Sequence, residues 1–164
     1  DSLPDGIKNS PAAVAETIVN NVRRSIVDER AMNPKYYDSM SKLLDDLIDK
    51  QKQDAAVYAD YLKDLVALAA QVGTGAPIGT YPGWASTPAR RALVDFTWPT
   101  DIGVDVDVED VLHTIQRQKE HSWASHPIRR KALAKALHNA LPAGFPLATL
   151  DDLLTLLGQH DEFR

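Results

Sequence analysis

Apolar residues recur at every third or fourth position through the first 72 residues, a spacing that predicts helices with one buried face. Ser10-Pro11 and Asn33-Pro34 each place a capping residue before a proline, the usual start of a helix. We therefore expect helices over about 11–31 and 34–54, and a third over about 57–72 that ends at Gly73. The positions expected to face the core are Val14, Ile18, Val22, Ile26, Tyr37, Met40, Leu43, Leu44, Leu47, Ile48, Tyr61, Leu65 and Leu68.

The second half of the chain opens with a stretch rich in glycine and proline and continues with helical patterns. Six of the eleven residues from Gly73 to Gly83 are Gly or Pro, which predicts a linker over 73–87. Further helices are expected over about 88–96, 107–121, 126–141 and 149–160. Their expected inward positions are Leu93, Phe96, Val108, Val111, Leu112, Ile115, Ile128, Leu133, Ala136, Leu137, Leu150, Leu153, Leu154 and Leu157.

One short segment alternates in the manner of a strand. Val104, Val106 and Val108 are separated by Asp105 and Asp107, which are poor strand formers, and no second strand pattern exists to pair with them. We interpret this segment as an extended approach to a helix. The predicted fold class is all-α, an irregular bundle of six or seven helices. Residues 1–9 are expected to form an extended lead-in and 10–164 a single domain, with three helices in 10–72 and three or four in 88–164.

Composition excludes several classes of protein. The 164 residues are 44% apolar and 25% charged with a net charge of −5, which is typical of one globular domain and not of a disordered chain. The absence of cysteine excludes thiol catalysis, zinc–cysteine sites and disulfides, and it favours a reducing compartment such as the cytoplasm. The longest apolar run, residues 65–70, is too short for a membrane span, and the first residues do not resemble a signal peptide. A start at Asp1 suggests a piece of a longer chain, or a processed or tagged one.

No catalytic or metal motif is found. The acidic residues between Asp101 and Asp110 do not fit a calcium loop, because a loop starting at Asp105 would need glycine where Asp110 stands and glutamate where Gln116 stands. Acidic residues at a helix start are the preferred interpretation, with a cation site as the weaker alternative. The five histidines lack the spacing of zinc proteases, and there is no nucleophile elbow. We therefore predict no catalytic residue, no metal and no cofactor in this chain.

One stretch carries most of the unbalanced positive charge. From Val111 to Ala140 there are six Lys and Arg residues and one acid, Glu120, which leaves −10 on the rest of a chain whose total is −5. Such segregation suggests a surface for an anionic partner, either DNA or an acidic protein, although a solvated helix face explains it equally well. The candidate contact residues are Arg117, Lys119, Arg129, Arg130, Lys131 and Lys135.

Two aromatic residues are added to the candidate contacts. Tyr36 and Tyr37 are adjacent, so we expect one ring to face the core and Tyr36 to be the more exposed. The three tryptophans flank predicted loops, where most anchor the loop by burial, but tryptophan is also enriched at interfaces. Trp84 is the tryptophan retained as a candidate partner contact.

Several runs resemble the C-terminal helical domain of type I restriction enzyme R subunits. The most specific are Asn20-Asn21-Val22-Arg23 and Asn33-Pro34-Lys35-Tyr36-Tyr37. The resemblance extends from about residue 10 to the end, and Trp98-Pro99 and His126-Pro127 depart from the family pattern. It is also carried by Val14–Val19, Asp38–Leu44, Tyr58-Ala59-Asp60-Tyr61-Leu62, Tyr81-Pro82, Thr87-Pro88-Ala89-Arg90-Arg91-Ala92-Leu93, Trp123 and Leu153–Phe163.

This resemblance implies a role in assembly. R subunits carry an endonuclease domain, two helicase domains that use ATP and Mg²⁺ to translocate DNA, and then this helical domain. The resemblance implies that the domain docks the motor subunit onto a methyltransferase core of modification and specificity subunits. No catalytic residue is carried over, because the nuclease and ATPase motifs belong to the upstream domains.

Two alternatives remain beside docking. The basic stretch suggests an arm that contacts DNA without sequence preference and releases it as salt rises. The other alternative is that the chain braces the upstream helicase domains of the same polypeptide. This alternative predicts exposed apolar residues near 1–9 and Tyr36. No membrane association is expected.

Overall fold

The computed structural model describes residues 11–53, 58–75, 81–103 and 105–164, and these ranges contain seven α-helices and no strand. The predicted all-α class with six or seven helices is thereby confirmed. The predicted lead-in over 1–9, the expected boundary between the second and third helices near residues 54–57, residues 76–80 of the predicted linker and Val104 lie outside the described residues. The helices are α1 (Pro11–Glu29), α2 (Pro34–Gln53), α3 (Tyr58–Thr74), α4 (Pro88–Asp95), α5 (Val108–Gln118), α6 (Pro127–Ala140) and α7 (Leu147–Gln159), with a short 3₁₀ turn η2 (Trp123–Ser125) before α6.

The chain divides into two compact units. The first contains α1, α2 from Tyr36 onward, and α3. The second contains α4 to α7 together with Ala31–Lys35, the segment that joins α1 to α2. Each unit has its own set of buried apolar residues. The prediction of a single domain over 10–164 stays a prediction.

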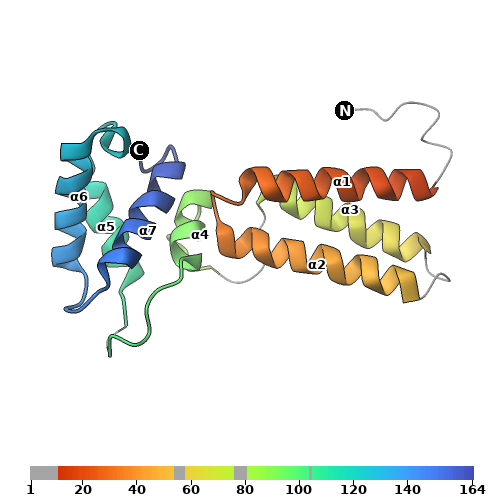
Figure 1. Cartoon of the computed structure of the whole chain (residues 1–164), viewed down its shortest axis with the longest axis horizontal. Coiled ribbons are helices and arrows are strands. Elements are labelled where there is room, and N and C mark those ends of the chain that lie inside the picture. The colour runs from red at the N-terminus through yellow and green to blue at the C-terminus, as the bar shows by residue number, and fades with distance from the viewer. Residues whose placement is uncertain (1–10, 54–57, 76–80, 104) are drawn as a thin grey trace. The chain divides into compact units, whose positions relative to one another are not determined.

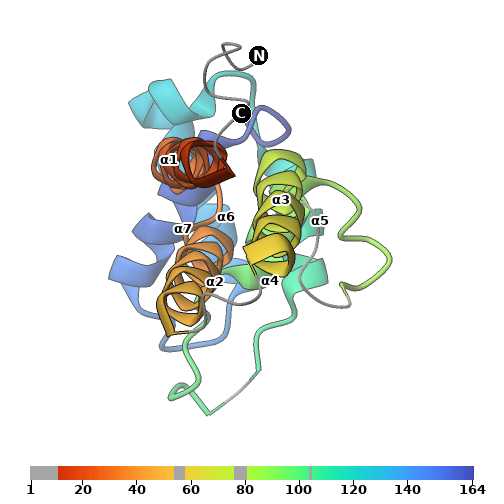
Figure 2. The same ribbon diagram turned by 90° about the vertical axis from the view of Figure 1, so that its right-hand side faces the viewer.

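The first unit is a three-helix bundle. Its helices run side by side (Figure 1), and the view along their axes in Figure 2 shows them at the corners of a triangle. Each helix therefore has two neighbours, which widens the arc of its surface that is buried. Its buried core residues are Ala15, Val22, Ile26, Tyr36, Tyr37, Met40, Leu44, Leu65, Leu68 and Val72.

The expected exposure of Tyr36 is wrong. Its side chain is 5% exposed, and its hydroxyl donates a hydrogen bond of 2.9 Å to the carbonyl of Gln71 in α3. Tyr37 is also buried, and the two rings meet edge to face with centroids 5.0 Å apart. Two adjacent rings are both covered because α2 contacts neighbours on two sides. Tyr36 therefore stabilises the first unit, and the brace hypothesis loses the exposed ring that it required.

The second unit packs α4 to α7 around fifteen buried apolar residues. Thr87 caps α4 by accepting a hydrogen bond from the Arg90 backbone N–H, and Asp107 caps α5 by accepting from the Asp110 N–H. The predicted extended approach before α5 agrees with the extended backbone of Asp107. The central side chains, each at most 1% exposed, are Leu93, Ile115, Trp123, Leu133, Leu137, Leu153, Leu157 and Phe163.

Several details differ from the sequence-based expectation, among them Leu43, which was expected to face the core and is 42% exposed. Helix α3 passes Gly73 and ends at Thr74, because the residue that takes the left-handed conformation of a helix end is Gly75, with φ +57°. Helix α5 ends at Gln118 rather than near His121. Ile128 was expected to face inward and is instead 76% exposed. Ile128 lies five residues before the buried Leu133, and at 100° per residue this spacing places the two side chains about 140° apart around α6.

Candidate interaction surface

The six basic candidates all belong to the second unit, but they are not equally available. Lys119 is the C-cap residue that follows α5, and its Nζ donates a hydrogen bond to the carbonyl of Glu162. Arg129 forms an ion pair with Glu120 at 3.2 Å and donates to the His121 carbonyl at 2.7 Å, while Arg130 pairs with Asp151 at 2.6 Å. Three of the six positive charges are therefore already engaged within the chain.

The other three basic candidates are exposed. Arg117, in the last turn of α5, makes one long hydrogen bond of 3.5 Å to Thr114. Lys131 and Lys135 lie one turn apart on α6, and neither has an ion-pair or hydrogen-bond partner among the residues that the structure describes. Among the six candidates, the positive charge available to a partner therefore lies on α6 and at the end of α5.

Trp84 and the C-terminal segment are held by a cluster of polar contacts around Glu162. Arg90 donates from Nε to the Glu162 carboxylate at 2.6 Å and from a terminal nitrogen to the Trp84 carbonyl at 3.2 Å. The Thr87 hydroxyl donates to the other carboxylate oxygen of Glu162. Trp84 is only partly exposed and packs on the core of the second unit, so its ring acts at least in part as an anchor for the loop before α4.

These contacts set the protonation of Glu162. Burial alone would raise the pKa of its carboxyl, but the hydrogen bonds from Thr87 and Arg90, with the charges of Arg90 and Lys119, outweigh it and lower the pKa below the ordinary value. The carboxylate is therefore held ionised. Because its pKa is lowered on folding, its contribution to stability is present above the unfolded-state pKa and is lost as the pH falls through the folded-state pKa.

Replacing Glu162 with glutamine is expected to destabilise the second unit by about 1–3 kcal/mol, because the change leaves the Arg90 guanidinium without its carboxylate partner. Urea unfolding at pH 7 followed by tryptophan fluorescence measures this loss, since all three tryptophans belong to this unit. Asp161→Asn is the matched control, because Asp161 is exposed and its ion pair with Arg164 lies on the surface. An equal effect of the two substitutions would contradict the role given to Glu162.

Contacts of Asn33 and Met32 join the segment Ala31–Lys35 to the rest of the second unit. Asn33, 9% exposed, donates from its amide to Asp95 at 2.8 Å, and the Tyr81 hydroxyl donates to the same carboxylate oxygen at 2.7 Å. A ring nitrogen of His160 lies 2.7 Å from the Met32 carbonyl. Since a carbonyl only accepts, this nitrogen carries the hydrogen. Burial lowers the pKa of His160 below its ordinary value, although the Met32 contact and the acids Glu162 and Asp161 raise it in part.

The lowered pKa of His160 predicts a loss of stability on mild acidification. The unfolded chain takes up a proton near the ordinary histidine pKa of about 6.5, whereas the folded chain resists it, so protonation favours unfolding as the pH falls below that value. We expect the urea midpoint of the second unit to fall between pH 7.5 and 5.5, and to fall less in His160→Gln. His138→Gln, which removes an exposed histidine, serves as control and should keep the wild-type slope. Identical slopes in all three proteins would contradict this assignment.

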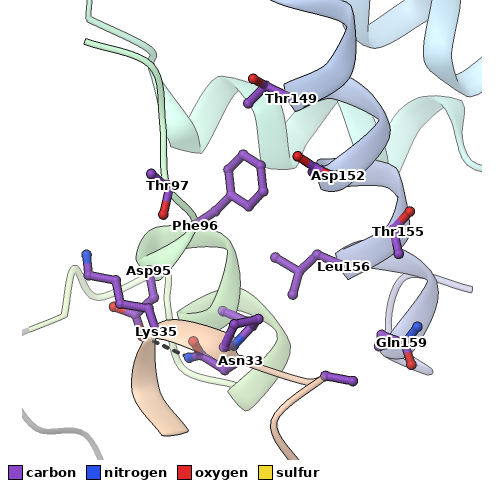
Figure 3. A pocket seen from close by; sticks show the side chains of 13 residues that line it. Asn33, Lys35, Asp95, Phe96, Thr97, Thr149, Asp152, Thr155, Leu156 and Gln159 are labelled. Carbon is purple, nitrogen blue, oxygen red and sulfur yellow. Dashed lines mark hydrogen bonds between the residues drawn. The ribbon is translucent and has the colours of Figure 1, made fainter. Parts of the chain in front are cut away.

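A groove of about 550 Å³ lies within the second unit beside this segment. Figure 3 shows the Phe96 ring and the Leu156 side chain pointing into it, from the end of α4 and from α7. Asp152 and Thr149 of α7 line one side, and Asn33 and Asp95 lie on the other. An apolar floor with a polar rim is typical of a surface that receives part of another molecule. The sequence did not predict this groove, because its walls come from three segments that are distant along the chain.

The described part of the chain contains no cluster of metal ligands, no candidate membrane span and no unpaired buried polar side-chain atom. No group of three or more His, Asp or Glu side chains there lies close enough to hold a metal ion. None of the helices in the described ranges combines the length and apolar character needed to cross a membrane. Every buried polar side-chain atom in these ranges has a hydrogen-bond partner, so none is left pointing unpaired toward a ligand.

Comparison with known protein families, curated proteins and solved structures finds no match to this chain.

Proposed function

We propose that this chain is a non-catalytic helical assembly module. It docks the ATP-dependent motor and endonuclease subunit of a type I restriction enzyme onto the methyltransferase core of modification and specificity subunits. In such an enzyme, ATP and Mg²⁺ act in the helicase domains of the same polypeptide, and the helical module supplies contacts only.

The observation that carries this proposal is the position of the resembling residues in the fold. Asn33, Tyr36 and Tyr37, from one of the two most specific runs, are all buried, whereas in the other run only Val22 is buried. The run 87–93 starts with the cap of α4, contributes three buried residues and includes Arg90, the partner of Glu162. Residues that fix a fold are those that a common architecture would retain, so the buried positions among the resembling residues support the proposal.

A DNA-contacting arm is the second candidate function. The observation in its favour is the pair of exposed lysines on α6, a helix that carries no acidic residue. Binding through phosphates depends on the number of cations available. The DNA-contacting arm is therefore disfavoured by the intrachain contacts of Lys119, Arg129 and Arg130.

Size-exclusion chromatography of the chain mixed with the modification and specificity subunits from the same genome tests the docking proposal. At tens of micromolar we expect the chain to elute with the core, and far-UV circular dichroism checks that it is folded. Separate elution of a folded chain and an assembled core would overturn the proposal. The second candidate function predicts binding of a 30-base-pair duplex at low salt and release as salt rises.

A further inference from the structure

The outer face of α6 is a continuous surface of mixed character. It consists of Ile128, Lys131, Ala132, Lys135, His138 and Asn139, all of which are exposed. Their spacing of three and four residues places them along one side of the helix, opposite the buried Leu133 and Leu137. In Figure 1, α6 lies at one edge of the second unit, with α5 and α7 beside it.

The charge of this face has one sign. Helix α6 contains no aspartate or glutamate, and Lys131 and Lys135 have no intrachain partner in the described ranges. Arg129 and Arg130 do not add to it, because Glu120 and Asp151 neutralise them. The face therefore presents two uncompensated ammonium groups one helical turn apart, in a chain whose total charge is −5.

The apolar residues of the outer face of α6 favour an acidic protein over DNA as its anionic partner. Ile128 is 76% exposed, the largest value among the exposed large apolar residues of the described chain, and Ala132 lies one turn further along the same face. Phosphate groups gain nothing from an isoleucine side chain, and two free lysines are few for a DNA surface. A protein surface with carboxylates around an apolar patch matches both components, since interfaces combine an apolar centre with a complementary charged rim.

We infer that the outer face of α6 is a docking surface for an acidic protein surface, with Ile128 and Ala132 as its apolar centre and Lys131 and Lys135 as its charged rim. The inference rests on the proposed function and names the site of docking: the acidic surface belongs to the methyltransferase core. Lysine and carboxylate charges steer the approach, and burial of Ile128 removes from water the apolar side chain that the fold leaves exposed.

The test measures binding of the full chain to the core by fluorescence anisotropy. The variants are the double charge reversal Lys131→Glu/Lys135→Glu and the single change Ile128→Asp. We expect each to weaken binding about tenfold or more, and wild-type affinity to fall as salt rises. The matched control is Lys42→Glu/Lys63→Glu, which reverses two exposed lysines of the first unit and should change affinity less than about twofold. Circular dichroism confirms that each variant is folded.

The possible failures are distinguishable. If the folded wild-type chain does not bind the core, the proposed function is overturned and this inference with it. If the wild type binds and both α6 variants bind equally well, docking stands and the α6 face is wrong. A 30-base-pair duplex is titrated in parallel, and tighter binding to it than to the core, lost in the double charge reversal, would overturn the inference in favour of a nucleic-acid contact.

Discussion

Replacing Trp123 with alanine is expected to destabilise the second unit by about 3–5 kcal/mol, a large part of the stability of a domain of this size. Trp123 is fully buried at the start of η2, and its Nε1 donates to the Phe163 carbonyl at 2.5 Å. Trp123 is therefore the largest side chain of the core, and its hydrogen bond links η2 to the C-terminal segment. Its removal leaves a cavity and also an unpaired buried carbonyl.

Urea unfolding followed by far-UV circular dichroism and by the fluorescence of the two remaining tryptophans measures this effect. Trp123→Phe separates the two contributions, because it keeps most of the ring volume and loses the hydrogen bond, and we expect it to be less destabilising than Trp123→Ala. Ile128→Ala is the control for a large apolar residue of the same unit that is exposed, with an expected change within about 0.5 kcal/mol. A loss below about 1 kcal/mol in Trp123→Ala would contradict the central position of this ring.

The helices could be predicted from the sequence because each carries its own local signals. Thr87-Pro88 and Asp107 start α4 and α5 through contacts made within four residues, and such contacts do not depend on the rest of the fold. The exposure of Ile128 also follows from its spacing to Leu133, once the angle of 100° per residue is applied strictly.

Tertiary contacts explain what the sequence could not predict. Tyr36 is buried because α3 supplies the Gln71 carbonyl, and no local pattern indicates that partner 35 residues away. The engagement of Arg130 depends in the same way on Asp151 of α7, 21 residues further along the chain. The net charge of a segment can be counted from its sequence, but which of its cations remain available to a partner depends on these distant acids.

Leu65→Ala is expected to destabilise the first unit by about 2–5 kcal/mol, because Leu65 is fully buried in the three-helix bundle. The same variant tests whether the chain unfolds as the single domain predicted from its sequence. All three tryptophans belong to the second unit, so their fluorescence reports on that unit, whereas circular dichroism at 222 nm reports on the helices of both. Because each unit has a separate core, we expect the circular dichroism midpoint to fall while the fluorescence midpoint stays.

Val66→Ala is the matched control, since Val66 is the next residue of α3 and is 55% exposed, and it should change neither midpoint measurably. If Leu65→Ala lowers both midpoints equally, unfolding is cooperative across the chain and the two units form one thermodynamic domain.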